Sequence, residues 1–517
     1  MTFEIVFVLL SLLGMVAALI ADKMRPGMIL FSVVVLFLCA GILTPKEMLE
    51  GFSNKGMITV ALLFLVSEGI RQSGTLGQVI KKLLPQGKTT VFKAQLRILP
   101  SVAFISAFLN NTPVVVIFAP IIKHWAKSVN LPATKFLIPL SYVTILGGIC
   151  TLIGTSTNLV VHGMILEAGF EGFPMFELGK VGIFIAIAGI IYIFLFSKRL
   201  LPDARPDTAV PDEEVEEGEK LHRVEAVLGA RFPGINKKLK DFNFQRHYGA
   251  EVKEIKTRNG QRFVSNLEEV VLHEGDTLVV MADDTFIPTW GESSVFVLLT
   301  NGNEPDTTGK KKRWFALLLL VLMIVGATVG ELPVTKEMFP DIKLDMFFFV
   351  SITTIIMAWT NLFPARKYTK YISWDILITI ACAFAISKAM VNSGVADSVA
   401  KFIIGLSDDY GPHVLLAMVF IITNLFTELI TNNAAAALAF PLALSISAQL
   451  GVSPTPFFVV ICMAASASFS TPIGYQTNLI VQGIGNYKFT DFVRIGLPLN
   501  IITFLISIIL IPLIWNF

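Results

Sequence analysis

The feature that most limits the fold of this chain is a series of long apolar segments that carry few charges. These segments cover residues 3–20, 28–43, 57–70, 134–165, 179–197, 314–330, 344–361, 374–390, 455–484 and 494–515. Charged residues make up only 15% of the chain, against about 25% in a typical soluble protein. A helix needs about 20 apolar residues to cross a bilayer. The sequence therefore predicts a polytopic α-helical membrane protein with about ten spans.

Two further apolar segments are interrupted by polar residues near their centres. The segment 98–122 contains Asn110-Asn111-Thr112-Pro113, and the segment 413–448 contains Thr431-Asn432-Asn433. Polar groups at lipid depth need partners inside the protein. A re-entrant hairpin, which enters and leaves on one side, therefore explains each segment better than a continuous span.

The second half of the chain repeats the first in the same order. With an offset near 320 residues, Ser67 and Gly74 match Ser387 and Gly394, Leu109–Thr112 matches Ile430–Asn433, and Gly154–Gly163 matches Gly474–Gly483. Chance similarity between apolar segments would align Leu and Val rather than these rarer polar residues. We interpret the pattern as a duplication.

Basic residues predict the orientation of the two halves. Loops rich in Lys and Arg, such as 71–97, 198–199 and 310–313, belong in the cytoplasm by the positive-inside rule. This assignment gives five spans per half, and because five is odd the second half must lie upside down relative to the first. We expect an inverted-topology repeat of five spans plus one re-entrant hairpin each, with both termini outside.

A segment of different character separates the halves. Pro202–Glu219 is rich in proline and acidic residues, and Leu221–Ala282 alternates polar and apolar residues between glycine turns, which is typical of a small α/β domain. The predicted order is a first transmembrane repeat, a linker, a cytoplasmic domain, a second linker and a second repeat, at residues 1–200, 203–219, 220–285, 286–312 and 313–517.

Each half thus places two polar breaks in apolar segments, a hairpin tip and an interrupted span. Packing about a pseudo-two-fold axis would bring the four breaks together. Broken helices offer N–H groups to an anion and free carbonyls to a cation, and Asn, Thr and Ser add neutral donors and oxygens. A single Ser or Thr in a span often only bonds its own helix, so the prediction rests on clusters that recur in both halves.

These clusters resemble those of the divalent anion/sodium symporter family within the ion-transporter superfamily. That family carries Ser-Asn-Thr at each hairpin tip, where Asn110–Thr112 and Thr431–Asn433 stand here, and its unwound-helix motifs are similar to Gly154–Asn158 and Thr471–Asn478. The resemblance implies two sodium sites, formed by Ser106, Asn110, Asn111 and Gly154 and by Thr427, Thr431, Asn432 and Gly474. It implies substrate contacts from Asn111, Thr112, Thr155, Ser156, Asn432, Asn433, Tyr475 and Gln476.

The chain also departs from the family pattern. Neither tip is an intact Ser-Asn-Thr, and Asn433 replaces a threonine at the expected anion contact. Sulfate and a dicarboxylate both stay candidates for the substrate. Other polar residues of the interrupted spans are Asn158 and Asn478. Glu428 lies within the second hairpin and could carry a proton or anchor the hairpin, and we favour the anchor because the family keeps a glutamate there.

The inserted segment resembles the C-terminal regulatory domain of TrkA-type potassium-uptake proteins (RCK-C). The similar stretches are Phe242–Glu254, Arg258–Gly260 and Leu272–Val280. The resemblance implies a ligand sensor, with a small-molecule regulator, or a dimerisation module. A passive insertion that only adds solubility is the alternative.

The predicted function is sodium-coupled symport of a small divalent anion by alternating access. A proton-coupled or efflux-type transporter of the same superfamily stays open, and an ion channel gated by the RCK-C-like domain is an alternative of another class. The spans contain no enzyme motif such as His-Glu-x-x-His, so we expect no enzymatic activity. We expect sodium as the coupling ion, no organic cofactor, no nucleic-acid partner, and a multi-pass homodimer in contact with lipid in the cell inner (cytoplasmic) membrane.

Overall fold

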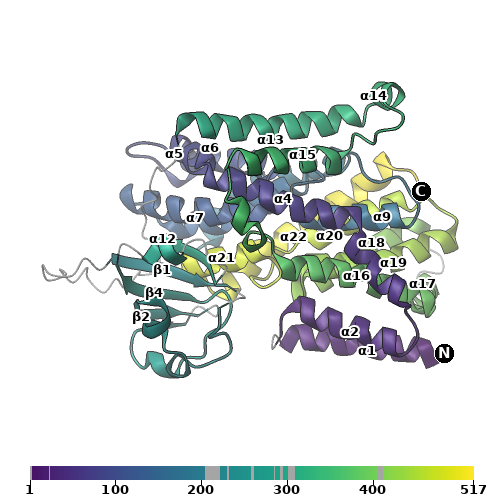
Figure 1. The fold of residues 1–517 in the computed structure, drawn as a ribbon, viewed down its shortest axis with the longest axis horizontal. Helices are drawn as coiled ribbons and strands as arrows, with labels where there is room; N and C mark the ends of the chain where they lie inside the picture. The colour runs from purple at the N-terminus through teal and green to yellow at the C-terminus, as the bar shows by residue number, and fades with distance from the viewer. Residues whose placement is uncertain are drawn as a thin grey trace, which may run out of the picture.

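The computed structural model of the protein is predominantly helical (Figure 1). The described residues are 3–21, 24–203, 222–229, 232–257, 261–283, 286–290, 295–300, 309–405 and 411–517. The linker predicted at 203–219, apart from Asp203, lies outside them, as do residues 301–308 and the motif Arg258–Gly260. Among the described residues, eight helices are long and apolar enough to cross a membrane.

The two halves contribute similar series of helices. The first contains α1 (Phe3–Ala21), α2 (Pro26–Cys39), α3 (Pro45–Glu50), α4 (Lys55–Gln72), α5 (Thr75–Leu83), α6 (Val91–Ser106), α7 (Asn111–Ser128), α8 (Leu137–Gly148), α9 (Ser156–Glu167) and α10 (Gly179–Leu200). The second contains α13 (Lys310–Gly330), α14 (Pro333–Met338), α15 (Met346–Trp359), α16 (Trp374–Asn392), α17 (Val395–Gly405), α18 (Gly411–Leu429), α19 (Asn432–Leu450), α20 (Thr455–Ser466), α21 (Gln476–Gly485) and α22 (Phe489–Ile514). Each predicted span falls on one helix or on a pair.

Helix α10 shows why these segments suit a lipid environment. It packs one side against α8 and α22. Between residues 181 and 197, its exposed side chains are all large and apolar, namely Ile183, Phe184, Ile187, Ile191, Leu195 and Phe196. A helix that is apolar on every side is stable where protein covers one face and lipid the other.

The polar motifs coincide with the helix breaks. Residues 149–155 separate α8 from α9, and residues 467–475 separate α20 from α21. The first hairpin turns at 107–110 between α6 and α7, and the second at 430–431 between α18 and α19. The sequence motifs therefore stand where helices stop and restart, which leaves backbone N–H and C=O groups without intrahelical partners.

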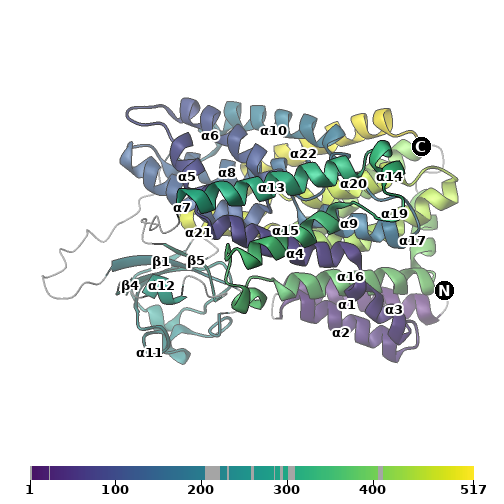
Figure 2. The same cartoon turned by 45° about the horizontal axis from the view of Figure 1, so that its top comes forward.

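Corresponding helices of the two halves pack crosswise. Helix α2 packs on α16 as α4 packs on α15, and α7 packs on α21 as α9 packs on α19. The hairpin α6–α7 lies at one end of the molecule and the hairpin α18–α19 at the other (Figures 1 and 2). The two hairpin tips therefore approach the centre from opposite ends.

In the sequence, a five-stranded sheet lies between the two halves. Its strands are β1 (His222–Leu228), β2 (Glu251–Lys256), β3 (Arg262–Phe263), β4 (Thr277–Ala282) and β5 (Phe296–Thr300), in the order β3-β2-β4-β1-β5 with antiparallel neighbours. The short helices α11 (Phe244–Tyr248) and α12 (Phe286–Trp290) accompany it. Aromatic rings of Phe232, Phe242, Tyr248 and Phe296 form its core.

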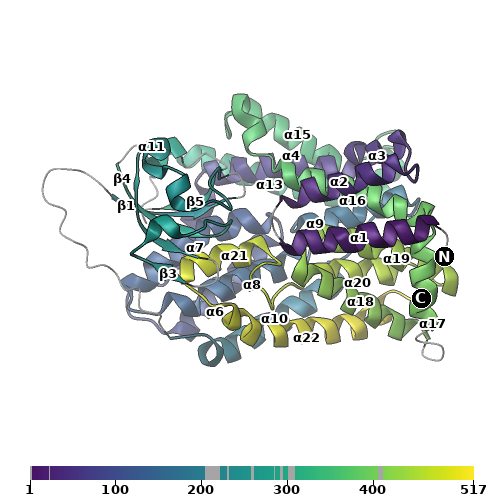
Figure 3. The ribbon, with the colours of Figure 1, turned by 90° about the horizontal axis from the view of Figure 1, so that it is seen from below.

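The sheet reaches beyond the boundary predicted at residue 285. Strand β5 pairs with β1, and Phe296 is buried in the aromatic core. Residues 296–300 therefore belong to the sheet and not to the linker predicted at 286–312. We call residues 222–300 the inserted domain. It lies beside α7 and α21, and both chain termini lie at the opposite end of the molecule (Figures 1 and 3).

Candidate functional site

The four polar breaks meet in the middle of the helical part, and each hairpin tip contacts the broken span of the other half. At the first tip, the amide of Asn111 lies 2.5 Å from the Tyr475 hydroxyl, and Thr112 Oγ1 lies 3.2 Å from Gln476 Oε1. At the second tip, Asn433 Oδ1 accepts from the hydroxyls of Ser156 and Thr157, at 3.3 and 3.2 Å. Residues more than 270 positions apart in the sequence thus form one cluster.

Around the first tip, Asn111 gathers the groups predicted for a sodium site. When its amide nitrogen faces Gly154, it donates to the carbonyls of Gly154 and Thr144, at 3.2 and 3.1 Å, and its oxygen accepts from Tyr475. Ser106 Oγ lies 2.8 Å from the same amide. The structure therefore brings together Ser106, Asn111 and the Gly154 carbonyl.

Asn110 is placed differently from the rest of its predicted set. It lines a small cavity of about 10 Å³ together with Ser67 and Ser156, on the side of the tip that faces α4. A cavity of this size is comparable to the space that one water molecule occupies. Asn110 thus borders a small cavity that residues of α4 and α13 also line.

The second tip repeats the arrangement with other residue types. Thr427 Oγ1 lies 2.8 Å from Asn432 Oδ1 and 2.5 Å from the carbonyl of Ala465, as Ser106 lies beside Asn111. The hydroxyl of Thr431 is buried without a hydrogen-bond partner among the described residues. Buried polar atoms without partners are rare in folded proteins, so this oxygen is well suited to a ligand role.

The two broken spans share a loop geometry that sequence reasoning missed. Thr151 Oγ1 accepts from the N–H of Gly154 at 3.2 Å, and Asn158 donates to the Thr151 carbonyl at 2.9 Å. In the other half, Thr471 accepts from Gly474 at 3.2 Å, and Asn478 donates to the Thr471 carbonyl at 3.1 Å. The signal was present as Thr-x-x-Gly-x-x-x-Asn in both halves.

The two glycines of these loops are required by close backbone approach. A Cβ at Gly154 would stand 2.5 Å from the Gly148 carbonyl oxygen and 3.0 Å from that of Ala107. A Cβ at Gly474 would stand 2.6 Å from the Thr427 carbonyl oxygen. Each broken span is therefore pressed against the last turn of the hairpin helix of its own half.

Glu428 is held by donors from the second broken span and from α22. Its carboxylate accepts from the N–H of Ser470 at 3.0 Å, from Asn500 Nδ2 at 2.7 Å and from the Ser468 hydroxyl at 3.3 Å. This contact network fits an anchor between the hairpin and the broken span.

Four helix N-termini converge on the cluster. Helices α7, α9, α19 and α21 begin at Asn111, Ser156, Asn432 and Gln476, and in the part of the chain that the structure describes none has a side-chain cap. An uncapped N-terminus presents free N–H groups and the positive end of the helix dipole. The arrangement can bind an anion without any positively charged side chain.

Comparison with known proteins identifies the family. The sequence model of the citrate transporter family matches residues 16–449 and 342–516. An uncharacterized transporter of Synechocystis is 30% identical over 94% of this chain and 93% of its own length. A putative sulfur deprivation response regulator of Chlamydomonas reinhardtii is 28% identical over 93% of this chain and 96% of its own, and a probable sodium/sulfate cotransporter 3 of the same alga is 23% identical over 93% and 85%. This chain is a multi-pass membrane transporter, not an enzyme, and it belongs to the citrate transporter family.

Proposed function

We propose that the protein couples sodium entry to the transport of a small divalent anion, with sulfate as the first candidate. The observation that carries the proposal is the convergence of four uncapped helix N-termini on a cluster of neutral side chains. The helix ends attract the anion, and a bound cation would balance the remaining negative charge. The name of the algal sodium/sulfate cotransporter favours sulfate over citrate or another carboxylate.

Neutral oxygens around each tip suit sodium. One ion would use Ser106, the Gly154 carbonyl and the amide oxygen of Asn111, which would turn toward Gly154 when the ion binds, with Asn110 closing the site from the cavity side. The other would use Thr427, Thr431, Asn432 and Gly474. Hydroxyl, amide and carbonyl oxygens are the ligands that hard monovalent and divalent cations prefer. The unpartnered hydroxyl of Thr431 supports the second site.

The anion would lie between the two tips. Its contacts would come from Asn111, Thr112, Thr155, Ser156, Asn432, Asn433, Tyr475 and Gln476. The Tyr475 hydroxyl contacts Asn111 and Thr155, so Tyr475 would also hold these two residues in place. The replacement of a threonine by Asn433 would supply an N–H donor to a compact anion such as sulfate.

The crosswise packing of the two halves supports an inverted repeat and alternating access. Hairpins at opposite ends of the molecule would close the site from the cytoplasm and from outside in turn. The inserted domain and both termini lie at opposite ends of the molecule, which supports a cytoplasmic inserted domain and outward termini. The relation of this domain to RCK-C is part of the proposal and rests on the stretches Phe242–Glu254 and Leu272–Val280. A homodimer in the inner membrane completes the proposal.

The test is labelled sulfate uptake into proteoliposomes, with and without an inward sodium gradient, and with unlabelled succinate or citrate as competitor. We expect sodium-dependent sulfate uptake that neither carboxylate blocks. Asn111→Ala and Asn432→Ala should each abolish uptake in protein that still inserts and elutes normally. Uptake driven by a proton gradient alone would move the proposal to proton coupling, and no sulfate uptake under any gradient would rule out sulfate as the substrate.

A further inference from the structure

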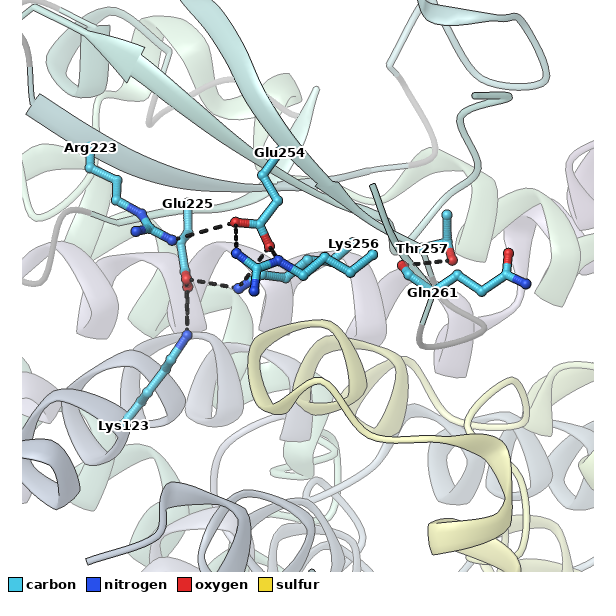
Figure 4. A network of polar contacts seen from close by, with 8 residues as sticks. Lys123, Arg223, Glu225, Glu254, Lys256, Thr257 and Gln261 are labelled. Atoms are coloured by element: carbon cyan, nitrogen blue, oxygen red, sulfur yellow. Dashed lines mark hydrogen bonds and ion pairs between the residues drawn. The ribbon is translucent and has the colours of Figure 1, made fainter. Parts of the chain in front are cut away.

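The inserted domain is tied to helix α7 by an ion pair. Lys123, near the C-terminal end of α7, lies with Nζ at 2.9 and 3.0 Å from the two carboxylate oxygens of Glu225 in β1 (Figure 4). Both side chains are largely buried, with 21% and 17% of their surfaces exposed. Two short bonds from a shielded cation define both the distance and the direction of the contact.

Glu225 is in turn oriented by a charged network on the face of the sheet. Lys256 Nζ in β2 lies 3.4 Å from Glu225 (Figure 4). Arg262 in β3 pairs with Glu254 in β2. Arg223 lies 3.6 Å from the same Glu254. Lys256 therefore helps to fix the Glu225 carboxylate on the sheet. The contact of Glu225 with Lys123 then ties the position of α7 to that of the sheet.

A second contact joins the inserted domain to helix α21. The loop before β4 lies so close that a Cβ at Gly275 would stand 2.6 Å from Leu479, and a Cβ at Gly483 would stand 2.6 Å from the Thr277 hydroxyl. The domain thus rests on α7 and α21, which also pack on each other.

These two helices are the ones whose first residues form one side of the candidate site. Helix α7 begins at Asn111 and α21 begins at Gln476, and Asn111 and Thr112 face Tyr475 and Gln476. A helix rises about 1.5 Å per residue, so Lys123 stands about 18 Å along α7 from Asn111, with Pro120 within the helix between them. A shift at the inserted domain would therefore move the hairpin tip.

We propose that the inserted domain sets the position of the first hairpin tip through the Lys123–Glu225 ion pair. Lys123 and Glu225 are then positioning residues for transport, because they hold α7 against the sheet while its N-terminus meets α21. This inference rests on the proposed function for its transport readout, but the mechanical link itself does not.

The experiment compares full-length variants in two assays. Lys123→Glu and Glu225→Lys each reverse one charge, and the double variant restores an opposite pair. Lys127→Glu, an exposed position one turn further along α7, is the matched control. The first assay is amide hydrogen exchange across residues 111–117 in detergent, in which the amides of 115–117 report, because the first N–H groups of α7 have no intrahelical partner and Pro113 has no N–H. The second assay is the KM and maximal rate of sulfate uptake.

We expect each single reversal to speed exchange at 111–117 by about tenfold and to raise the sulfate KM by about three- to tenfold with a smaller effect on maximal rate. The double variant should recover at least half of both effects.

Unchanged exchange in Lys123→Glu relative to Lys127→Glu would overturn the proposal. If the reversals fold poorly, the uncharged Lys123→Met decides the exchange assay in the same way. Absence of sulfate transport by the unmodified protein would refute the proposed function, and the exchange assay would still decide the link.

Discussion

At the scale of single residues, Tyr475 shows how one half of the chain completes the site of the other. Its hydroxyl lies 2.5 Å from Asn111 and 3.0 Å from Thr155 Oγ1, and the ring is buried. Asn111 and Thr155 both come from the first half of the chain, so the position of the first tip depends on a residue of the second half. A buried group that loses its partner costs about 1 to 3 kcal/mol.

We therefore predict that Tyr475→Phe lowers the free energy of unfolding by about 1 to 2 kcal/mol and reduces sodium-dependent uptake at least tenfold. The measurements are thermal unfolding in detergent and uptake into proteoliposomes. Tyr192→Phe is the control, since Tyr192 donates to the Ile495 carbonyl at 3.0 Å away from the tips. It should match the stability loss but retain uptake, and equal uptake by both variants would remove Tyr475 from the site.

Glu428 allows the roles of proton carrier and anchor to be separated. We predict that Glu428→Gln keeps a folded protein with sodium-dependent uptake, because an amide oxygen can still accept from Ser470 and Asn500. Glu428→Ala should cost about 2 to 4 kcal/mol, because it strands these buried donors. Thermal unfolding and uptake at two pH values provide the test. Complete loss of coupled uptake in a stable Glu428→Gln protein would instead identify a proton carrier.

The candidate residues were predictable to different degrees. Asn111, Asn432 and the two Gly-containing loops stand out in the sequence because rare polar residues recur in apolar surroundings. Thr151 was left out of the first loop motif, and Thr471 was included in the second without a role, because a single threonine in a span resembles one that merely bonds its own helix. Lys123 and Glu225 carry no local signal, since their pairing depends on how a separate domain docks.

At the scale of elements, periodicity and breaks were more informative than length. The interrupted spans and both hairpins were predicted because Asn, Thr and Gly inside an apolar run cannot face lipid. The short helices α3, α5, α14 and α17 were not predicted, because each has too few residues to show a clear period. Strand β5 was assigned to a linker because its pairing with β1 bridges a long separation in sequence.

The ion pair that docks the inserted domain should depend on pH in a defined direction. Burial alone would raise the pKa of Glu225, but Lys123 and Lys256 lower it to about 2 from the usual 4.5. A carboxyl whose pKa is lowered by folding stabilises the folded state above its ordinary pKa, and this contribution is lost as pH falls toward the lowered value. The charged side chains of Arg223, Arg262 and Glu254 lie nearby on the same sheet and do not belong to the Lys123–Glu225 pair.

We predict that docking is constant between about pH 5 and 8 and weakens between about pH 4.5 and 2, by at most about 3 kcal/mol. Hydrogen exchange at 111–117, recorded across this range and corrected for intrinsic rates, measures the effect. In Glu225→Gln this component of the pH dependence should disappear. An identical acid response in the variant would show that other carboxylates control the docking.

At the scale of the whole molecule, the topology joins the sequence pattern to the direction of transport. Basic loops and an odd number of spans predict opposite orientations of the two halves, and the structure places the two hairpins at opposite ends. Helix α13 is the useful reporter. Its 21 residues span about 31 Å, close to the thickness of the hydrocarbon core, and it follows directly after the inserted domain.

We predict that a cysteine at Lys310, at the start of α13, is protected from an impermeant thiol reagent in intact cells, whereas one at Lys336 in α14 is labelled. Both positions are exposed, so protection would report the membrane and not burial. The background must lack Cys39, because that thiol is exposed. Permeabilisation should make Lys310→Cys reactive without changing Lys336→Cys. The reverse pattern would place the inserted domain outside and would exchange the hairpin that faces the cytoplasm for the other one. Labelling at both sites would mean that α13 does not cross the membrane, which would remove the basis for two oppositely oriented halves.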